Sequence, residues 1–448
     1  MFLADIRSIA ALAWPVLVGQ LAVIAFGVLD TAMAGRASAA DLAAIGLGGS
    51  IYVTVYISLM GVLQALSPIA GQLYGAGRHG EIGEEVRQAA WLGLALSAIG
   101  MLLLWFPAPL LRLADASPEL TGKATAYLRY EALALPAALG FRIYSALNNA
   151  LSRPVMVTVL QLGGLALKFP LNALFLYGGL GLPAMGGPGC ALASMIIGWL
   201  WCIAGALILM RNPVYRPFRI FTQFSPPHLG RLWGLVRLGV PMGLTYLIEI
   251  TSFTLMAIFI ARMGTVVLAG HQIAANVGTV AYMVPLSLSI ATSTLVAQMI
   301  GARDRDAARR IAWNGLKLAA ACAIAVGGCV LLLRRDLVGL YTRDATVMAI
   351  AVPLLPFIAF YQLFDALQVT AAFILRAYKI ALIPTVIYAL SLWGVGLGGG
   401  YLLGFGLLGE SAAALRGAAG FWAANALSLA VAGTLLVGYF NRISRAAD

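Results

Sequence analysis

Three acidic residues lie inside long apolar stretches of this sequence. Asp30 lies in AFGVLDTAMAG, Glu249 in PMGLTYLIEITSFTLMAIF and Asp365 in FIAFYQLFDALQVTAAF. A charge in the middle of a membrane costs roughly 2.5–3.5 kcal/mol on insertion scales, so acids in such places mark ion or proton pathways. Burial disfavours the charged form of a carboxyl group, and a buried acid that takes up a proton near neutral pH is what a proton-coupled carrier needs.

The neighbours of each acid bear on this interpretation. Asp30 follows mostly apolar residues after Pro15, so the alternative is an interfacial acid near the outer end of its helix. The polar residues that follow Glu249 most closely are Thr251 and Ser252, which leaves it without an evident permanent partner.

Asp365 has oxygen-bearing neighbours on its own helix. Tyr361 precedes it by one turn on the same face, and Gln362, which is also a candidate cavity residue, precedes it by three residues. A carboxylate with a phenol and an amide beside it either holds a proton or chelates Na⁺ through oxygens.

One lysine also lies within an apolar stretch. Lys168 lies in GGLALKFPLNALFLYG, with Asn172 one turn further on. It needs a counter-charge or a water-filled cavity, unless its ammonium reaches an interface along its aliphatic stem. We predict a buried ion pair between Lys168 and Asp30.

Three other polar residues are weaker candidates. Gln272 and Asn276 are four residues apart on one helix face, where they either line a cavity or form hydrogen bonds between helices. Glu131 precedes Pro136, and we interpret it as an interfacial acid.

The composition indicates what holds these residues. Of the 448 residues, 61% are hydrophobic and 10% are charged, whereas a soluble domain has about 25% charged residues. So few charges cannot cover a water-facing surface, which predicts an all-α integral membrane protein. The net charge of +12 does not indicate nucleic-acid binding, because the basic residues occupy short gaps between apolar stretches.

The sequence contains no constellation for catalysis or for a structural metal. The four cysteines lie in apolar stretches without a C-x-x-C pair, and the three histidines lack metal-ligand spacing. No nucleophile–base pair is evident, so we expect neither an enzyme nor a cofactor. We also expect no cleavable leader, because the first apolar run continues past Asp30 without a cleavage pattern.

A membrane span needs about 20 mostly apolar residues, and the sequence has twelve such stretches. They are residues 10–35, 45–70, 89–111, 127–151, 155–178, 188–210, 236–261, 267–297, 311–333, 347–374, 380–404 and 417–440.

The basic residues indicate the orientation. With the N-terminus in the cytoplasm, 17 of the 29 lysines and arginines fall in inner segments, Arg376 and Lys379 among them. Nine fall in outer segments, and Arg142, Lys168 and Lys317 fall within spans. Cytoplasmic segments are enriched in basic residues, so we predict a multi-pass protein with both termini in the cytoplasm.

The two halves of the chain repeat. At an offset of 226 residues, Pro15 meets Pro241, and Q-L-Y-G-A from Gln72 meets Q-M-I-G-A from Gln298. Six spans per half make the repeat parallel, as in transporters built from two bundles. We therefore predict two pseudo-symmetric six-helix bundles, residues 1–210 and 236–448, joined by a cytoplasmic linker at 211–235.

Several motifs together give the chain a family likeness. It resembles the multidrug and toxic compound extrusion (MATE) family, in its NorM-like branch. The motifs are P-V-L and D-T-A-M-A-G between Pro15 and Gly35, P-I-A-G-Q-L-Y-G-A-G at 68–77, R-L-G-V-P at 237–241, A-G-H-Q-I-A-A-N at 269–276 and Y-Q-L-F-D-A-L-Q-V at 361–369.

The resemblance implies two six-helix lobes across a substrate cleft and the export of cationic, aromatic compounds by antiport with H⁺ or Na⁺. The family's acids correspond to Asp30, Glu249 and Asp365, and its tyrosine corresponds to Tyr361. We expect a monomer in a bacterial inner membrane, with cationic drugs and the lipid bilayer as its partners.

One departure from the family pattern bears on the coupling ion. NorM-like members commonly have two polar residues one turn apart facing the first acid, and here Lys168 replaces the first while Asn172 keeps the second. An ammonium beside Asp30 would occupy the place of Na⁺ and favour the ionised acid. We therefore expect coupling at Glu249 and Asp365, by H⁺ rather than Na⁺, which is the alternative at these two residues.

Two other functions are weighed against export. A flippase of lipid-linked precursors shares the two-lobe plan but needs a cationic cavity for anionic headgroups, whereas the buried charges here are mostly acidic. A channel or receptor fits two repeated bundles with opposed acids less well than a gated carrier does.

Overall fold

The computed structural model describes residues 1–112, 117–179, 181–407, 409 and 415–446. In these ranges the chain is helical, and a single isolated bridge between Gly179 and Leu182 is its only β-type pairing. The helices of the first half are α1 (Phe2–Ala37), α2 (Ala39–Leu63), α3 (Leu66–Gly75), α4 (His79–Trp105), α5 (Ala108–Arg112), α6 (Pro118–Ala150), α7 (Pro154–Tyr177), α8 (Gly187–Arg211) and the 3₁₀ turn η1 (Pro213–Phe218).

The second half is also built from helices. Its helices are α9 (Leu229–Ala261), α10 (Thr265–Gly301), α11 (Arg305–Leu332), α12 (Arg334–Tyr341), α13 (Ala345–Ala377), α14 (Leu382–Tyr388), the π-helix η2 (Ala389–Gly398), α15 (Gly399–Gly404) and α16 (Ala418–Ala446).

Each of the twelve predicted spans lies on one of these helices or on helices in series. Within the described residues, eleven helices or series are long and apolar enough to cross a membrane. The remaining predicted span, residues 127–151, lies on α6, a helix of 33 residues that carries five charged side chains. The predicted all-α membrane fold is confirmed.

Short polar residues determine where several helices begin. The side chains of Ser38, Asp304 and Asp344 accept hydrogen bonds from backbone N–H groups in the first turns of α2, α11 and α13. These are N-caps, which satisfy donors that have no partner within the helix. Asp344 also accepts from the Thr346 hydroxyl, and its two bonds to Thr346 hold the pKa of its carboxyl group below the usual value.

The chain forms two compact units. The N unit is Val18–Gly243, and the C unit is Met1–Leu17 together with Leu244–Asp448. The division falls inside the two long helices α1 and α9, shortly after Pro15 and Pro241. The same offset of 226 residues relates both the prolines and the two division points. Residues 211–235 belong to the N unit, and the predicted lobe limits stay a prediction.

Each unit is built around one central helix. In the N unit α6 packs against α2, α4 and α8, and in the C unit α13 packs against α10, α11 and α16. In chain order, α10, α11, α13 and α16 of the C unit correspond to α2, α4, α6 and α8 of the N unit. The repeat seen in the sequence is therefore a repeat of packing.

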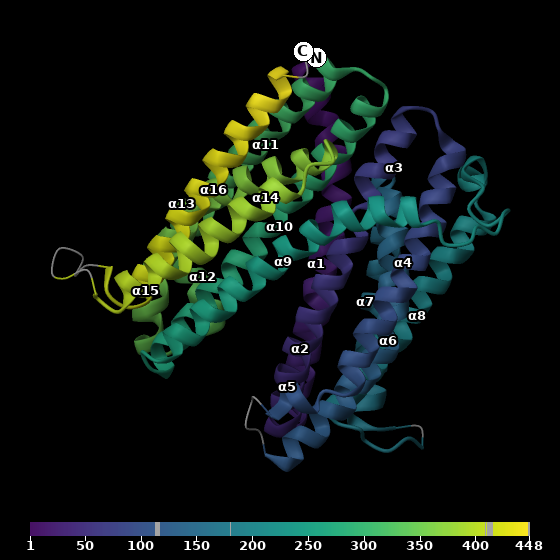
Figure 1. The fold of residues 1–448 in the computed structure, drawn as a ribbon. Helices are drawn as coiled ribbons and strands as arrows, with labels where there is room; N and C mark the ends of the chain where they lie inside the picture. The colour runs from purple at the N-terminus through teal and green to yellow at the C-terminus, as the bar shows by residue number, and fades with distance from the viewer. Residues whose placement is uncertain (113–116, 180, 408, 410–414, 447–448) are drawn as a thin grey trace. The chain divides into compact units, whose positions relative to one another are not determined.

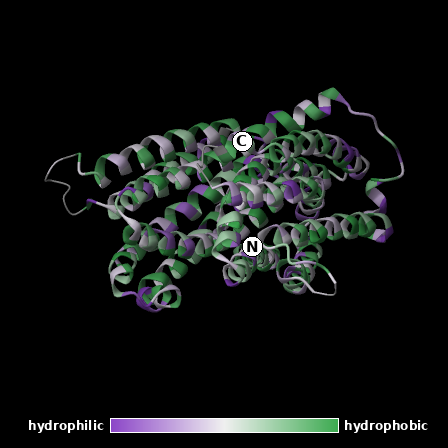
Figure 2. Cartoon of the chain, turned by 90° about the horizontal axis from the view of Figure 1, so that it is seen from below, coloured by the Kyte–Doolittle hydropathy of each residue, from purple (hydrophilic) through white to green (hydrophobic). Residues whose placement is uncertain are grey.

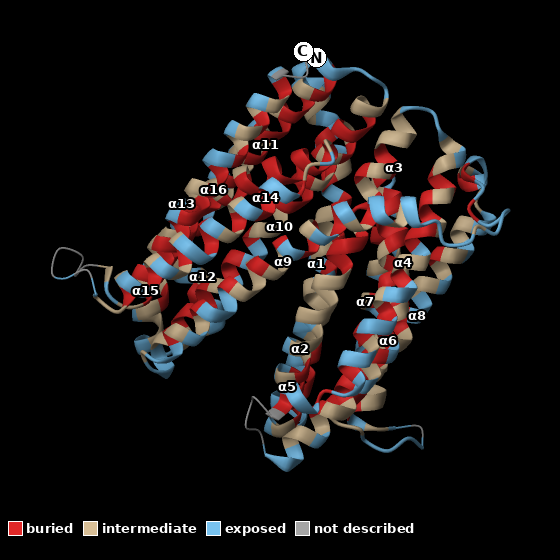
Figure 3. Ribbon diagram, viewed as in Figure 1, coloured by how far each residue is buried: buried red, intermediate tan, exposed pale blue. Residues whose placement is uncertain are grey.

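Apolar residues occupy both the core of each unit and the outward-facing surfaces of its helices. Figure 2 shows mostly hydrophobic to neutral colours along the helices, and Figure 3 shows exposed residues along the helices as well as in their connections. Large apolar side chains such as Leu102, Val159, Phe360 and Leu390 are exposed within helices. An apolar exterior of this kind suits contact with lipid, which the composition predicted.

Candidate functional site

The acid of the N unit is paired with a lysine. Asp30 on α1 and Lys168 on α7 form an ion pair, with 2.9 Å between the lysine Nζ and Asp30 Oδ1. Lys168 is fully buried and Asp30 is 8% exposed. The predicted ion pair is therefore present, and the alternatives of an interfacial acid and of a lysine that reaches an interface are wrong for this arrangement.

The Lys168 ammonium has two hydrogen-bond acceptors besides its ion-pair partner Asp30. Besides Asp30, Nζ donates to the Cys190 carbonyl at 3.1 Å and to the Ser194 Oγ at 2.6 Å, both on α8. The ring of Phe26 lies 5.1 Å from Nζ, within the range of a cation–π contact. The ammonium therefore contacts a carboxylate, a carbonyl group, a hydroxyl group and an aromatic ring.

Asn172 completes the surroundings of Asp30. Its Nδ2 donates to Asp30 Oδ1 at 2.7 Å, so the same oxygen accepts from both residues of α7. Asn172 Oδ1 is buried and has no hydrogen-bond partner among the described residues.

Glu131 belongs to the same cluster, which the sequence interpretation missed. It is 3% exposed, on α6, so the prediction of an interfacial acid is wrong. Tyr127 and Tyr52 form hydrogen bonds with its carboxyl group, and Lys168 and Asp30 interact with it electrostatically. The N unit therefore buries two acids and one lysine together.

The last predicted acid lies in the core of the C unit. Asp365 on α13 is 5% exposed, and its Oδ1 accepts a hydrogen bond from Gln368 Nε2 at 3.1 Å. The amide beside this acid is therefore Gln368, one turn later on α13. Gln362 instead donates to the Ala281 carbonyl of α10 at 3.0 Å and is fully buried.

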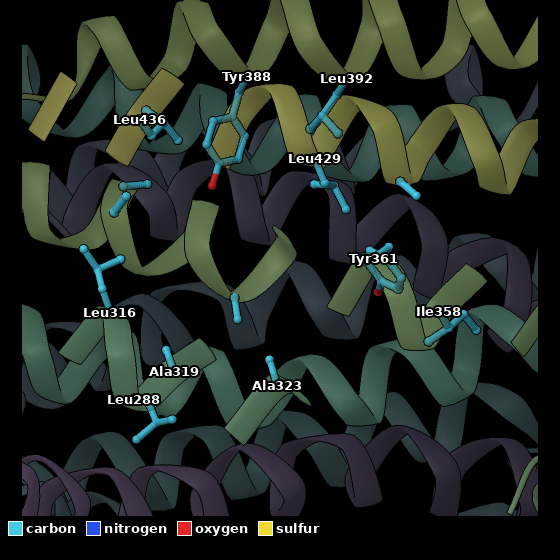
Figure 4. Packing of buried hydrophobic residues seen from close by; sticks show 14 of the residues in the cluster. Leu288, Leu316, Ala319, Ala323, Ile358, Tyr361, Tyr388, Leu392, Leu429 and Leu436 are labelled. Carbon is cyan, nitrogen blue, oxygen red and sulfur yellow. The ribbon is translucent and has the colours of Figure 1, made fainter. Parts of the chain in front are cut away.

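Tyr361 lies one turn before Asp365, as predicted, and interacts with it electrostatically. Its ring is buried against Trp422 of α16, with 6.1 Å between ring centroids. Figure 4 shows Tyr361 and Tyr388 among the aliphatic side chains of the C-unit core.

Glu249 on α9 is partly exposed and faces the same region. The hydroxyl group of Tyr388 forms a hydrogen bond with its carboxyl group, and Asp365 is close enough to repel it. Neither Glu249 nor Asp365 has an ion-pair partner within 4 Å in the part of the chain that the structure describes, in contrast to Asp30.

A buried arginine accompanies these two acids. Arg376 on α13 is 4% exposed, whereas the sequence placed it in a cytoplasmic segment. Its Nη1 donates to the Tyr246 hydroxyl at 3.2 Å, and its guanidinium lies 4.5 Å from the Phe373 ring centroid. Arg376 also attracts Glu249 electrostatically, so the C unit holds one cation near two acids.

The two polar residues of α10 lie on the surface of the C unit. Gln272 and Asn276 are both exposed, one turn apart, on the face opposite buried His271 and Ile273. Their predicted contribution to a cavity stays a prediction.

Helix spacing contained a signal for the residues that the sequence interpretation missed. Tyr127 and Glu131 are four residues apart, and Arg376 follows Asp365 by eleven residues, about three turns. Each pair shares a helix face. The partners Tyr388 and Ser194 come from other helices and had no such signal.

Comparisons with known proteins identify a family model and several relatives that match this chain. The sequence model of the family described as MatE matches residues 15–174 and 241–402. A protein of Aromatoleum aromaticum named "Probable multidrug resistance protein NorM" is 38% identical over 96% of this chain and 92% of its own length. One of the same name from Chromobacterium violaceum is 39% identical over 99% of this chain and 95% of its own length.

Solved structures share the fold. The eukaryotic MATE transporter AtDTX14 superposes with a TM-score of 0.87 at 18% identity, over all of this chain and 98% of that one. The Vibrio cholerae MATE transporter VcmN in its bent form gives 0.88 at 17% identity, over 99% and 98% of the two chains. At this identity the likeness establishes the fold.

Proposed function

This chain belongs to the MatE family of multidrug efflux transporters, and from that premise we propose that it exports cationic, aromatic compounds in exchange for protons. Members of this family are transporters, so the chain is not an enzyme. No observation favours the flippase alternative, because the relatives are named multidrug resistance proteins.

The observation that carries the proposal is the contrast between the acids of the two units. Asp365 is buried, without an ion-pair partner among the described residues, and repels Glu249. Two neighbouring carboxylates, of which Asp365 is buried, cannot both remain charged at low cost. The C unit therefore takes up a proton or another cation, and this uptake supplies the energy for export.

The N unit supports protons over sodium as the coupling ion. A Na⁺ ion at Asp30 would compete with the Lys168 ammonium, which lies 2.9 Å from the carboxylate and is held in place by two further hydrogen bonds. Coupling then rests on Glu249 and Asp365, with Tyr361 and Tyr388 beside them. Na⁺ at these two acids is the alternative outcome of the test.

The transport cycle alternates between two states of the C-unit acids. Proton uptake from outside neutralises Asp365 or Glu249, changes the packing around α13 and expels the bound cation. The two bundles then rock to the inward-open state, and the acids release their protons to the cytoplasm. The ionised carboxylates attract the next cationic substrate. We place the protein, as a monomer, in a bacterial inner membrane.

The coupling ion is tested with the full chain in proteoliposomes loaded with the fluorescent cation ethidium. An imposed pH gradient in sodium-free buffer should drive transport, and a Na⁺ gradient without a pH difference should not. Transport that needs Na⁺ and ignores the pH gradient would overturn proton coupling.

The same assay tests the role of Asp365. Asp365→Asn should abolish pH-driven transport, because the amide cannot exchange a proton, while helix content measured by circular dichroism stays unchanged. Asp336→Asn, an exposed aspartate on α12, is the matched control and should transport like the wild type. Transport at the wild-type rate in Asp365→Asn would exclude this acid from the coupling.

A further inference from the structure

We propose that Glu131 is a second proton-binding residue, in the N unit, and that its proton neutralises the buried cluster of Asp30, Glu131 and Lys168. The inference rests on the proton coupling proposed above. It adds a proton-binding residue in the N unit, whereas Glu249 and Asp365 lie in the C unit.

The first argument is burial. Glu131 lies on the central helix α6 of the N unit and is 3% exposed. An ionised carboxylate in such a place needs a cation of its own, because removal of an ion from water costs several kcal/mol even after the protein relaxes. Without such a cation the group binds a proton instead.

The second argument is that the nearby cation is already in use. Lys168 forms an ion pair with Asp30 Oδ1 and donates hydrogen bonds to the Cys190 carbonyl and Ser194 Oγ. Among the described residues it forms no such contact with Glu131, which it attracts only at longer range. Two acids and one lysine carry a net charge of −1 when both acids are ionised, and a single proton makes the cluster neutral.

A second cation lies near in sequence but not near in space. Arg129 precedes Glu131 by two residues on α6, where side chains point to different faces. Its side chain is exposed, and its guanidinium lies over the Trp105 ring at 5.8 Å from the centroid. Arg129 therefore does not neutralise Glu131.

The third argument is the site that α2 and α6 build around this carboxyl group. Tyr127 lies one turn before Glu131 on α6, and Tyr52 reaches it from α2. Gly48, one turn before Tyr52, makes room for the Tyr127 ring, because a Cβ there would lie 2.7 Å from Cδ1 of Tyr127. Two hydroxyl donors satisfy both the acid and its ionised form, as a group that exchanges protons requires.

Tyr52 also provides a route for the proton. It is only partly buried, and its ring stacks on Tyr56 with 5.7 Å between centroids. Tyr52 therefore links Glu131 to a part of α2 that is only partly buried.

The titratable groups around Glu131 come from every neighbouring helix. Asp30 on α1 and Lys168 on α7 are described above, and Cys190 on α8 interacts with both. The titratable groups of α4 lie in its first turns, where Glu84, Glu85 and Arg87 bind the 219–231 segment. The remaining titratable side chains on helices that pack against α6 are Asp41, Tyr56, Tyr74, His79, Glu81, Tyr177, Cys202 and Arg211.

The proton step changes only the charge of the cluster. Release of H⁺ converts the Glu131 carboxylic acid to carboxylate and takes the cluster from neutral to a net charge of −1. The negative state attracts a cation to the N unit, and proton uptake removes that attraction. Each unit then holds a carboxyl group that gains and loses a proton.

The test is infrared spectroscopy of the purified full chain, titrated through the pH range in which it stays folded. The C-unit acids are first removed by Glu249→Gln and Asp365→Asn, and Glu131→Gln is then added to this protein. We expect a carboxylic-acid C=O band that disappears as the pH rises and that is lost entirely with Glu131→Gln. Glu119→Gln, at an exposed acid of the same helix, should leave the band unchanged.

An unchanged band in the Glu131→Gln protein would overturn the proposal. Failure of that protein to fold would also count against it, because glutamine has the shape and charge of the protonated acid. The failures of the two proposals are distinguishable. A band assigned to Glu131 in a protein that transports only with Na⁺ would refute the proposed coupling and keep this site, whereas proton-driven transport without the band would refute this site alone.

Discussion

Single residues decide which acid of this transporter has a cationic partner. Asp30 has a buried lysine as its partner, whereas Asp365 has an amide and a phenol beside it. The same residue type at similar burial is therefore ion-paired in one unit and lacks an ion-pair partner among the described residues in the other. The difference arises from one position, Lys168.

The Lys168–Asp30 pair yields a prediction about stability. Lys168→Met keeps the side-chain stem but leaves a buried charge without its partner, a change that costs about 3–5 kcal/mol. We expect a lower midpoint of thermal unfolding in detergent, largely restored when Asp30→Asn is added in the same chain.

Lys317→Met, at an exposed lysine of α11, is the matched control and should leave the midpoint near that of the wild type. An unchanged midpoint in Lys168→Met would mean that the ion pair does not stabilise the N unit.

At the scale of elements, helix packing brings the charged residues together. The ribbon in Figure 1 shows long helices with short connections, and within each unit one central helix carries a buried acid, Glu131 on α6 and Asp365 on α13. Glycines allow the close approach of neighbouring helices, as at Gly327 of α11, where a Cβ would lie 2.6 Å from the Ala359 carbonyl oxygen of α13.

Two adjacent glycines of α11 test this packing. Gly327→Ala should push α11 and α13 apart and lower the unfolding midpoint, since overpacking costs about 1–3 kcal/mol. Gly328→Ala meets no atom within 4 Å and should be neutral or raise the midpoint, because alanine favours the helix by up to about 1 kcal/mol. Equal effects of the two substitutions would refute the close contact as the reason for Gly327.

At the scale of the whole molecule, the distribution of basic residues determines the expected orientation. The inner segments hold nearly twice as many lysines and arginines as the outer ones. Arg376 is one of the residues counted as inner, and the bias keeps its direction even without it.

Reporter fusions test this orientation. Green fluorescent protein fused after residue 446 should fluoresce, because it matures in the cytoplasm, and alkaline phosphatase fused at the same place should be inactive. Phosphatase inserted after Tyr341, in the outer segment that follows α11, should be active. The reverse pattern would place both termini outside.

Hydropathy and repeat spacing alone determined the fold of this protein. A stretch of some 20 apolar residues must be helical in lipid, because its backbone groups find no other partners there. The twelve spans, the two bundles and the buried positions of Asp30, Asp365 and Lys168 all follow from patterns that are local along the chain.

Only the tertiary structure placed Glu131 and Arg376 among the buried charges. Glu131 resembles an interfacial acid in the sequence because it precedes Pro136 near the expected outer end of its span, yet it is buried beside Tyr52 of α2 and Lys168 of α7. Arg376 counts as an inner residue in the sequence because it lies between the predicted spans 347–374 and 380–404, yet it is buried and bound by Tyr246 of α9. Each partner comes from a helix distant in the chain, and the energy of a buried charge depends on those partners.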